Sequence, residues 1–228
     1  MMFLTPTIIN DGRLLYISSQ PASYMCSKES SKTVSNPTLP DGIEFSRFFK
    51  KQGADSLWFS SALRMNSTFP YIAPVVTLPS EPAIEIMDAG FRDNYGMSIA
   101  IKYIYTFRNW ISTNTSGVII IQTRDTYRRV TMENKSNNSL LNTISNPVGN
   151  IYSNMFNMQD FNHDQLIQYA GSWFDAPIDV IDLQLKSQDV TNISLSWHLT
   201  SKEKVRIRES VKLPENQQAI KKLKELLQ

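Results

Sequence analysis

The sequence predicts an α/β protein with three layers (α/β/α), in which helices cover both faces of a mainly parallel β-sheet. Two observations lead to this prediction. The apolar segment 84–87 is followed by a helix-like segment over 97–113 and by the continuous apolar run 117–124. A strand, a helix and a buried strand in this order are typical of a βαβ unit. The chain has 228 residues, 41% of them hydrophobic, so it can form a sizeable core.

The segments before this unit are assigned from local patterns. Short apolar runs on either side of the Asp11-Gly12 turn predict two strands. Apolar residues at helical spacing predict two helices, a stretch rich in Ser, Pro, Lys and Thr predicts a loop, and a segment with four prolines predicts irregular extended backbone. In chain order these are the strands 3–9 and 13–18, the loop 19–41, the helices 44–52 and 54–67, and the extended segment 69–82.

The segments after the βαβ unit continue the alternation of helices and strands. Residues 126–150 are polar and rich in Asn and Ser, which is typical of an excursion from the core. The final segment begins with Pro214 at its first turn and carries apolar residues on one face, which favours a helix. The expected elements are the helices 163–174, 201–212 and 214–228 and the strands 178–185 and 193–197.

Composition excludes several classes of function. The net charge of +2 and the absence of a basic cluster argue against nucleic-acid binding. Cys26 is the single cysteine, so no intramolecular disulfide forms, and no Cys/His zinc pattern is present. The apolar runs are too short to span a bilayer, and the start "MMFLTPTIIN" lacks the features of a signal peptide. A cytoplasmic location is therefore expected.

One carboxylate has the position of a functional group. In "IEIMDAGFRDNYG" (84–96), Asp88 follows the predicted strand directly, and in parallel α/β sheets functional residues collect at the carboxyl ends of strands. Ala89 and Gly90 leave the approach to this carboxylate open. A carboxylate held in this way can accept a proton from a nucleophile. The alternative is that Asp88 belongs to an ordinary turn or caps a helix.

Other polar residues give weaker patterns. His163, with Asp160 and Asp164 nearby, fits a metal ligand or a base, but also fits a polar helix start in which Asp164 complements the helix dipole. His198 is expected to be a packed or surface residue. Further residues have ordinary structural readings: Ser60 and Ser61 inside a predicted helix, Arg92 and Asp93 pairing with neighbours, Gly96 in a loop, and Tyr103, Phe107 and Trp110 in the core.

The segment "SSALRMNSTFPYIAPVV", together with "DAGFRDNYG", resembles the C-terminal half of a patatin-like phospholipase domain. In that family a segment A-S/T-x-x-x-P-x-x-x-P precedes a strand that ends in D-G-G or D-G-A, and the Asp completes a Ser–Asp dyad. "STFPYIAP" and "DAG" match these motifs here, while "NHDQLIQYAGSWFD", "IDVIDLQL" and "SLSWHLTSKEKVRI" resemble the tail of a Bacteroidetes-type branch. The motif-specific part of the resemblance covers residues 60–96.

The sequence departs from the family in one respect. None of its eight glycines forms the G-x-S-x-G elbow that carries the family's serine, and no Gly-rich loop offers an oxyanion hole. The resemblance therefore implies that residues 1–125 are the C-terminal half of a hydrolase core and that 126–228 are an extension packed on the same domain. The nucleophile would lie outside this chain.

For function, the resemblance implies hydrolysis of a lipid or acyl ester by a Ser–Asp dyad without a metal or cofactor. Asp88 would be the catalytic base, and Ala89, Gly90 and Asn94 would form the rim of the active site. Contact with a membrane surface is conceivable through the mixed basic helices near the carboxyl terminus. The alternative is a catalytically silent scaffold or oligomerisation module, because an exposed sheet edge favours pairing with a second copy.

Overall fold

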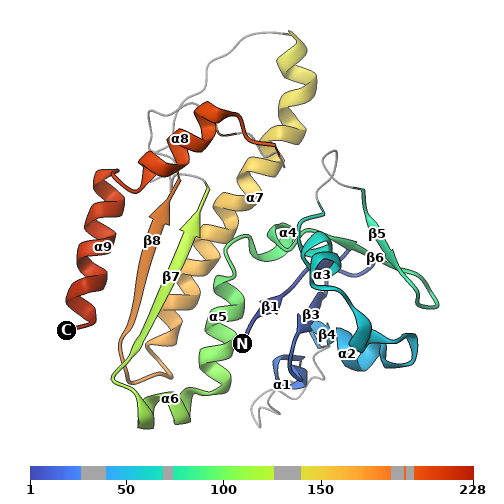
Figure 1. The fold of residues 1–228 in the computed structure, drawn as a ribbon, viewed down its shortest axis with the longest axis horizontal. Helices are drawn as coiled ribbons and strands as arrows, with labels where there is room; N and C mark the ends of the chain where they lie inside the picture. Colours follow the sequence, from blue (N-terminus) through green and yellow to red (C-terminus); the bar gives the residue numbers. More distant parts are fainter. Residues whose placement is uncertain (27–39, 69–73, 126–139, 186–192, 194–197) are drawn as a thin grey trace. The chain divides into compact units, whose positions relative to one another are not determined.

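A computed structural model describes residues 1–26, 40–68, 74–125, 140–185, 193 and 198–228, and within 140–154 it describes the backbone alone. The chain divides into two compact units, Met1–Asn94 and Tyr95–Gln228 (Figure 1). We refer to them as the N-terminal unit and the C-terminal unit and describe each by itself. Among the described helices, none combines the length and the apolar character that crossing a bilayer requires.

The N-terminal unit is built on a mostly antiparallel sheet. Its described strands are β1 (Phe3–Leu4), β2 (Thr7–Ile8), β3 (Leu14–Ser18), β4 (Gly42–Glu44), β5 (Val76–Leu78) and β6 (Ile84–Met87). Both β1 and β2 pair with β3, β6 lies between β2 and β5, and all of these pairs are antiparallel. Only β4 runs parallel to its neighbour β3.

The predicted strand 3–9 is interrupted in its middle. Leu4 pairs with Ile17 and Thr7 pairs with Leu14, so β1 and β2 follow each other along the same partner strand. Between them stands Pro6, which has no backbone N–H to donate, although its carbonyl accepts a hydrogen bond from the N–H of Leu15 at 2.9 Å. The interruption therefore bends the strand without separating it from β3.

Short helices cover this sheet and complete its core. They are α1 (Ser23–Cys26), α2 (Phe45–Phe48), the 3₁₀ turns η1 (Lys50–Gln52) and η2 (Ala54–Ser56), α3 (Phe59–Asn66) and α4 (Gly90–Asp93). Gly53 adopts a left-handed conformation, with φ 77°, and separates η1 from η2. The two predicted helices 44–52 and 54–67 are thus broken into α2 with η1 and η2 with α3. The core consists of Leu4, Ile8, Leu15, Ile17, Phe45, Phe49, Ala54, Ala62, Met65, Leu78 and Ile86.

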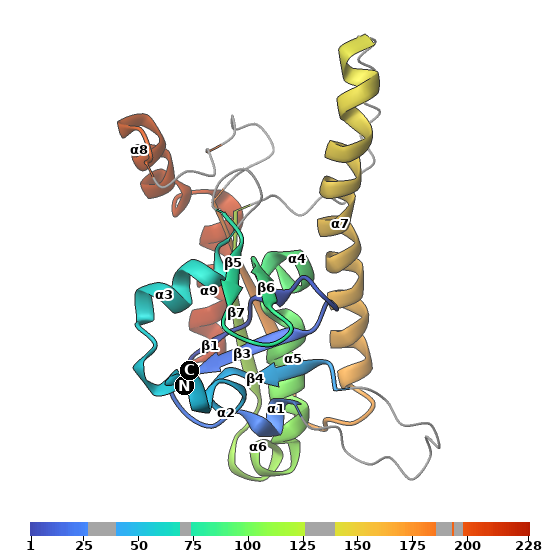
Figure 2. The ribbon, with the colours of Figure 1, turned by 90° about the vertical axis from the view of Figure 1, so that its right-hand side faces the viewer.

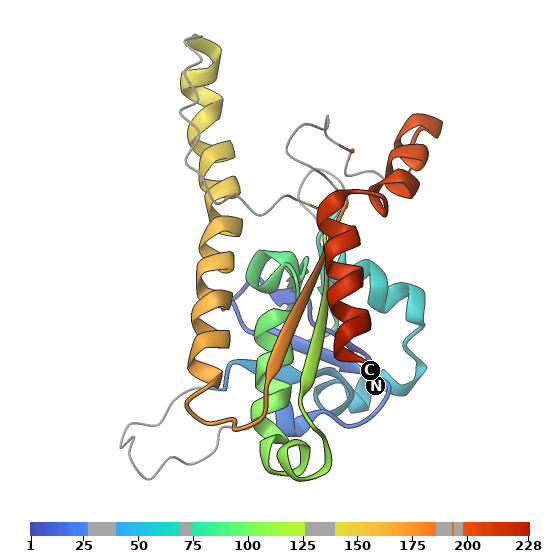
Figure 3. The ribbon, with the colours of Figure 1, turned by 90° about the vertical axis from the view of Figure 1, so that its left-hand side faces the viewer.

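The C-terminal unit contains two parallel strands among helices. The strands are β7 (Val118–Arg124) and β8 (Ile178–Gln184), and the helices are α5 (Met97–Thr106), α6 (Arg108–Asn114), α7 (Leu140–Ala170), α8 (Ser201–Ser210) and α9 (Pro214–Leu226). Figures 1, 2 and 3 show the strands between α9 on one face and α5 with α7 on the other. The core on the α5 and α7 side is formed by Met97, Ile101, Ile104, Ile111 and Phe174, with Val118, Ile120, Leu166, Ile167, Ile178 and Val180 packed against it.

The predicted three-layer fold with a mainly parallel sheet is wrong. It joined the strands 84–87 and 117–124 as neighbours in one sheet, but β6 has β2 and β5 on its two edges and no edge left for β7. Strand β7 pairs with β8 instead, across the long crossover that contains α7. The error arose because β5 lies in the proline-rich segment 69–82, where no strand was predicted, although it forms an antiparallel pair with β6.

Several elements were predicted correctly. Strand 84–87 coincides with β6, the strands 117–124 and 178–185 correspond to β7 and β8, and the last two helices correspond to α8 and α9. The helix 97–113 is divided into α5 and α6, and the helix 163–174 is the end of the longer α7. Predictions for 126–139 and for most of 193–197 fall outside the described residues, whereas residues 140–150 of the predicted excursion 126–150 belong to α7 instead. The assignment of 1–125 and 126–228 as a hydrolase core and its extension stays a prediction.

Candidate functional site

The structure places Asp88 where β6 ends and α4 is about to begin. The Asp88 N–H donates to the carbonyl of Thr68 at 2.7 Å, and the Ala89 N–H donates to the carbonyl of Asn66 at 3.2 Å. The two segments that carry the family resemblance, one at the end of α3 and one after β6, are therefore joined by backbone hydrogen bonds. This contact fixes the main chain on which the Asp88 side chain is carried.

The two carboxylate oxygens of Asp88 have different surroundings. Oδ1 accepts a hydrogen bond from the Gly90 N–H at 2.6 Å, which closes a turn directly before α4, as the alternative of an ordinary turn predicted. Oδ2 has no hydrogen-bond partner among the described residues. Burial raises the pKa of the Asp88 carboxyl, and the hydrogen bond from Gly90 only partly opposes this effect. A half-buried carboxylate with one held and one open oxygen is suited to accepting a proton.

The predicted rim residues lie around this carboxylate. Ala89 stands between Asp88 and α4 in helical conformation. Gly90 is buried, and a Cβ at this position would lie 2.5 Å from Asn94 Oδ1 and 2.6 Å from Asp88 Oδ1. Glycine is therefore the residue that lets the Asp88 and Asn94 side chains approach the same point of the helix start. Their role as an active-site rim stays a prediction.

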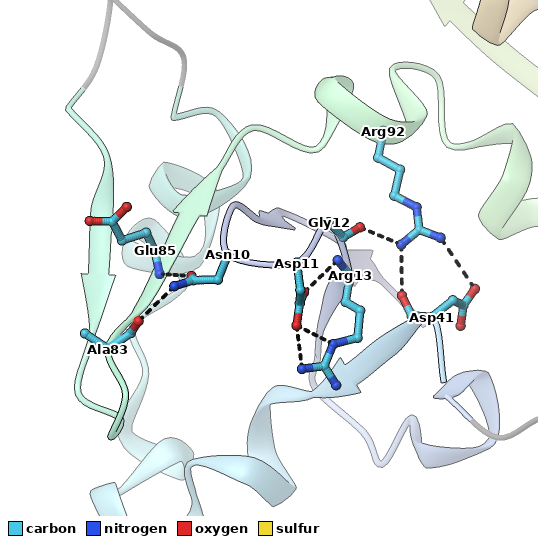
Figure 4. A network of polar contacts seen from close by, with 8 residues as sticks. All are labelled: Asn10, Asp11, Gly12, Arg13, Asp41, Ala83, Glu85 and Arg92. Carbon is cyan, nitrogen blue, oxygen red and sulfur yellow. Dashed lines mark hydrogen bonds and ion pairs between the residues drawn. The ribbon is translucent and has the colours of Figure 1, made fainter. Parts of the chain in front are cut away.

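Arg92 fastens α4 to the rest of the N-terminal unit, as Figure 4 shows. Its guanidinium donates to the carbonyl of Gly12 at 2.8 Å and to the carbonyl of Asp41 at 2.9 Å. The Asp41 carboxylate lies 3.9 Å from the same guanidinium. The prediction that Arg92 pairs with neighbours is confirmed. Arg92 lies on α4, which follows Asp88 and Ala89 directly. These contacts therefore also hold the backbone next to Asp88.

The two serines considered as nucleophiles are not joined to Asp88. Ser60 and Ser61 are exposed residues of α3, and no hydrogen bond connects either of them to Asp88 within the described residues. Both lie in the regular first turn of α3, without the strained strand-to-helix turn that exposes an elbow serine. No activated serine is therefore identified in the described part of the chain.

A second polar cluster lies in the C-terminal unit, at the carboxyl ends of β7 and β8. Arg124 forms two hydrogen bonds to the Asp160 carboxylate on α7, at 2.8 and 2.6 Å, and its side chain is only 2% exposed. The guanidinium also lies over the Tyr95 ring, 4.0 Å from the ring centroid. Burial lowers the Arg124 pKa, but the contacts with Asp160 outweigh it, so the net direction is upward. The geometry is that of a buried ion pair.

The reading of His163, Asp160 and Asp164 as a metal site is not supported. His163 is buried on the face of α7 that also carries Asp160, whereas Asp164 is exposed and His198 is exposed. Asp160 is engaged by Arg124. Among the described residues, no group of three or more His, Cys, Asp or Glu side chains is arranged to hold a metal ion.

Sequence reasoning missed two buried charges. Arg124 was read only as the end of an apolar strand. The signal was its place directly after the buried segment "VIIIQT", because a buried cation needs a paired carboxylate. Glu44 is 7% exposed and accepts hydrogen bonds from the Ala22 N–H, the Ser23 hydroxyl and the Ser46 hydroxyl. Burial raises the Glu44 pKa, but these hydrogen bonds more than offset it and hold the pKa below its usual value.

Comparisons with known proteins identified no relative. No protein-family model, no curated protein and no solved structure matches this chain.

Proposed function

We propose that this chain supplies the carboxylate of a serine acyl hydrolase, with Asp88 as general base, as the resemblance to patatin-like phospholipases implies. The substrate would be a lipid or another acyl ester. The serine would come from outside residues 1–228, because the sequence contains no G-x-S-x-G segment. The observation that carries the proposal is the open Oδ2 of Asp88 on a loop fixed by its backbone.

The proposed reaction proceeds in two steps. The Asp88 carboxylate accepts the proton of the serine hydroxyl while the serine oxygen attacks the ester carbonyl, and the alcohol leaves with that proton. Water then donates a proton to the same carboxylate and attacks the acyl-enzyme, which releases the carboxylic acid and restores the serine. Asp88 returns to its ionised form in each step, so no cofactor enters the balance.

The pKa of Asp88 supports this role. A general base is most effective when its pKa lies closer to the working pH than that of a fully solvated carboxylate. Burial shifts the Asp88 carboxyl in this direction. The Gly90 N–H binds Oδ1, and Oδ2 has no hydrogen-bond partner among the described residues, which is consistent with the role proposed for it in a dyad.

The test compares two carboxylates of the same segment in a protein that contains both this chain and the coding region preceding it in the gene. Hydrolysis of p-nitrophenyl esters is measured for the parent, for Asp88→Asn and for Glu85→Gln. Glu85 is the matched control, since it is an exposed carboxylate on β6. We expect Asp88→Asn to lower kcat by about 100- to 10,000-fold, and Glu85→Gln to leave it unchanged.

Two results would contradict the proposal. One is a preceding region without a serine elbow, and the other is full activity in Asp88→Asn. Intact-mass labelling of the 228-residue chain with a fluorophosphonate locates the nucleophile. No adduct is expected on the chain alone, and a stoichiometric adduct would place the serine within it.

The second candidate function is an interaction module without chemistry. The observation that favours it is a group of large apolar side chains on the surface of the N-terminal unit, which includes Trp58 at 77% and Phe59 at 57% exposure. The nature of the partner follows from the charges around this group.

A further inference from the structure

Segment 47–64 of the N-terminal unit exposes large apolar side chains. Phe48, at the end of α2, is 49% exposed, and Trp58 and Phe59, at the start of α3, are 77% and 57% exposed. Leu63, one helical turn after Phe59, is 42% exposed. Figure 2 shows this stretch, from α2 to α3, along the outside of the unit. We call it the 47–64 surface.

The same segment is strongly cationic. Arg47, Lys50, Lys51 and Arg64 are all exposed, whereas Asp55 is the only acidic residue between 47 and 64. None of these cations has a salt bridge to an acidic residue within the described part of the chain. Arg47 interacts electrostatically with the buried Glu44 carboxylate, whereas the charges of Lys50, Lys51 and Arg64 are available to an external anionic partner.

A hollow of about 400 Å³ adjoins this surface. Its lining is mixed. Phe59, Leu57 and Phe45 contribute apolar side chains, and Gln20 and Asp55 contribute polar ones. The hollow therefore offers only partly apolar space beside the exposed aromatic side chains.

We propose that the 47–64 surface rests on an anionic lipid bilayer. Trp and Phe side chains settle at the boundary between headgroups and acyl chains, and neighbouring Lys and Arg are attracted to anionic headgroups. The cations occur on both sides of Trp58 and Phe59 in sequence, which suits a headgroup plane better than a single acidic peptide. This inference does not depend on the esterase proposal, because binding is measured without turnover.

Vesicle co-sedimentation with the full chain tests the proposal. The probes are vesicles of phosphatidylcholine alone and of phosphatidylcholine mixed with phosphatidylglycerol. We expect binding to the anionic vesicles that weakens as salt is added. Lys50→Glu with Lys51→Glu should weaken it by at least about 25-fold, about fivefold for each cation removed. Trp58→Ala with Phe59→Ala should weaken it by at least about tenfold.

A matched control distinguishes binding through this surface from nonspecific binding to vesicles. Trp110 on α6 belongs to the C-terminal unit and is 63% exposed, so the prediction that it lies in the core is wrong. Trp110→Ala should leave vesicle binding unchanged.

With anionic vesicles the tryptophan emission should shift to shorter wavelength, and Trp58→Phe should remove most of that shift. Because every altered side chain is exposed, the melting temperatures of the variants should equal that of the parent.

Three outcomes would overturn the proposal. Equal binding to both vesicle types, or binding that none of the variants at 50, 51, 58 and 59 changes, would exclude this surface as the contact. A dimer in light scattering that Trp58→Ala with Phe59→Ala dissociates would assign the surface to a second copy. Protection of Trp58 from iodide quenching in the absence of vesicles would mean that another part of the chain covers it.

Discussion

The two units hold carboxylates in opposite ways. In the C-terminal unit, Asp160 binds Arg124 through two short hydrogen bonds, and the pair is shielded by burial. In the N-terminal unit, Asp88 has one oxygen bound to a backbone N–H and no cation bound to its carboxylate in the described residues, and burial raises its pKa. The first carboxylate is paired with a cation, whereas the second has no paired cation among the described residues and its pKa is raised by burial. The difference separates a carboxylate held in a buried ion pair from one held, within the described part of the chain, only by a backbone N–H.

The largest effect is expected from breaking the buried ion pair. Arg124→Met leaves Asp160 as an uncompensated charge beside the core, and should lower the free energy of unfolding by about 3–5 kcal/mol. Urea denaturation followed by circular dichroism measures it. Asp160→Leu combined with Arg124→Met should recover most of the loss, because both charges are then absent. A single variant as stable as the parent would show that the pair is not formed.

A smaller loss is expected at Asn216, which is 4% exposed. Its side chain accepts from the Gln184 N–H at 2.8 Å and donates to the carbonyls of Gln184 and Ser210 at 2.7 and 2.6 Å. Asn216→Ala leaves these groups unsatisfied and should cost about 1–3 kcal/mol of unfolding free energy. The neighbouring Gln217→Ala, which removes one exposed hydrogen bond, should cost less than about 0.5 kcal/mol. Equal costs for both would refute the assignment.

The smallest expected effect is a gain in stability, and it concerns Asp88. Because the folded-state pKa of Asp88 is raised, the folded state binds the proton more tightly than the unfolded state. Its contribution to stability is complete below the ordinary value of 3.8 and is lost as the pH rises through the folded pKa. Asp88→Asn should therefore be more stable than the parent at neutral pH, by about 0.5–1 kcal/mol.

The pH dependence is the diagnostic part of this prediction. The advantage of Asp88→Asn should disappear in thermal melts at acid pH, where the parent carboxyl is protonated. Glu85→Gln provides the comparison, since Glu85 is exposed. If the parent were the more stable protein at neutral pH, the carboxylate would be held by a partner, as Asp160 is.

Local elements were accessible from the sequence, but their partners were not. Period and composition predicted β6, β7 and β8 because each is a short apolar run bounded by polar residues. Nothing in these runs specifies the neighbouring strand. Strand β6 pairs with β2, almost 80 residues earlier, and with β5, which the surrounding prolines concealed. Parallel pairing was therefore assigned to the wrong pair of strands.

The candidate site shows the same limit. The position of Asp88 after a strand and the reason for Gly90 followed from the sequence, and so did the contact role of Arg92. The pairing of Arg124 with Asp160 did not, because these residues are 36 positions apart and meet only when α7 packs on β7. Charges that are neutralised across a fold leave no local pattern.

Asn216 has a consequence for how the chain behaves at high concentration. At the end of β8, successive residues direct their backbone groups to opposite sides. The Leu185 N–H donates to the Arg124 carbonyl on β7, whereas the N–H and carbonyl of Gln184 face the outer edge. The Asn216 amide meets both groups of Gln184 as a strand of another molecule would. Asn10 binds the Glu85 N–H and the Ala83 carbonyl and so continues the pairing of β2 with β6 inside the molecule. The Asn216 side chain thus occupies a position that would otherwise seed intermolecular β-pairing and aggregation.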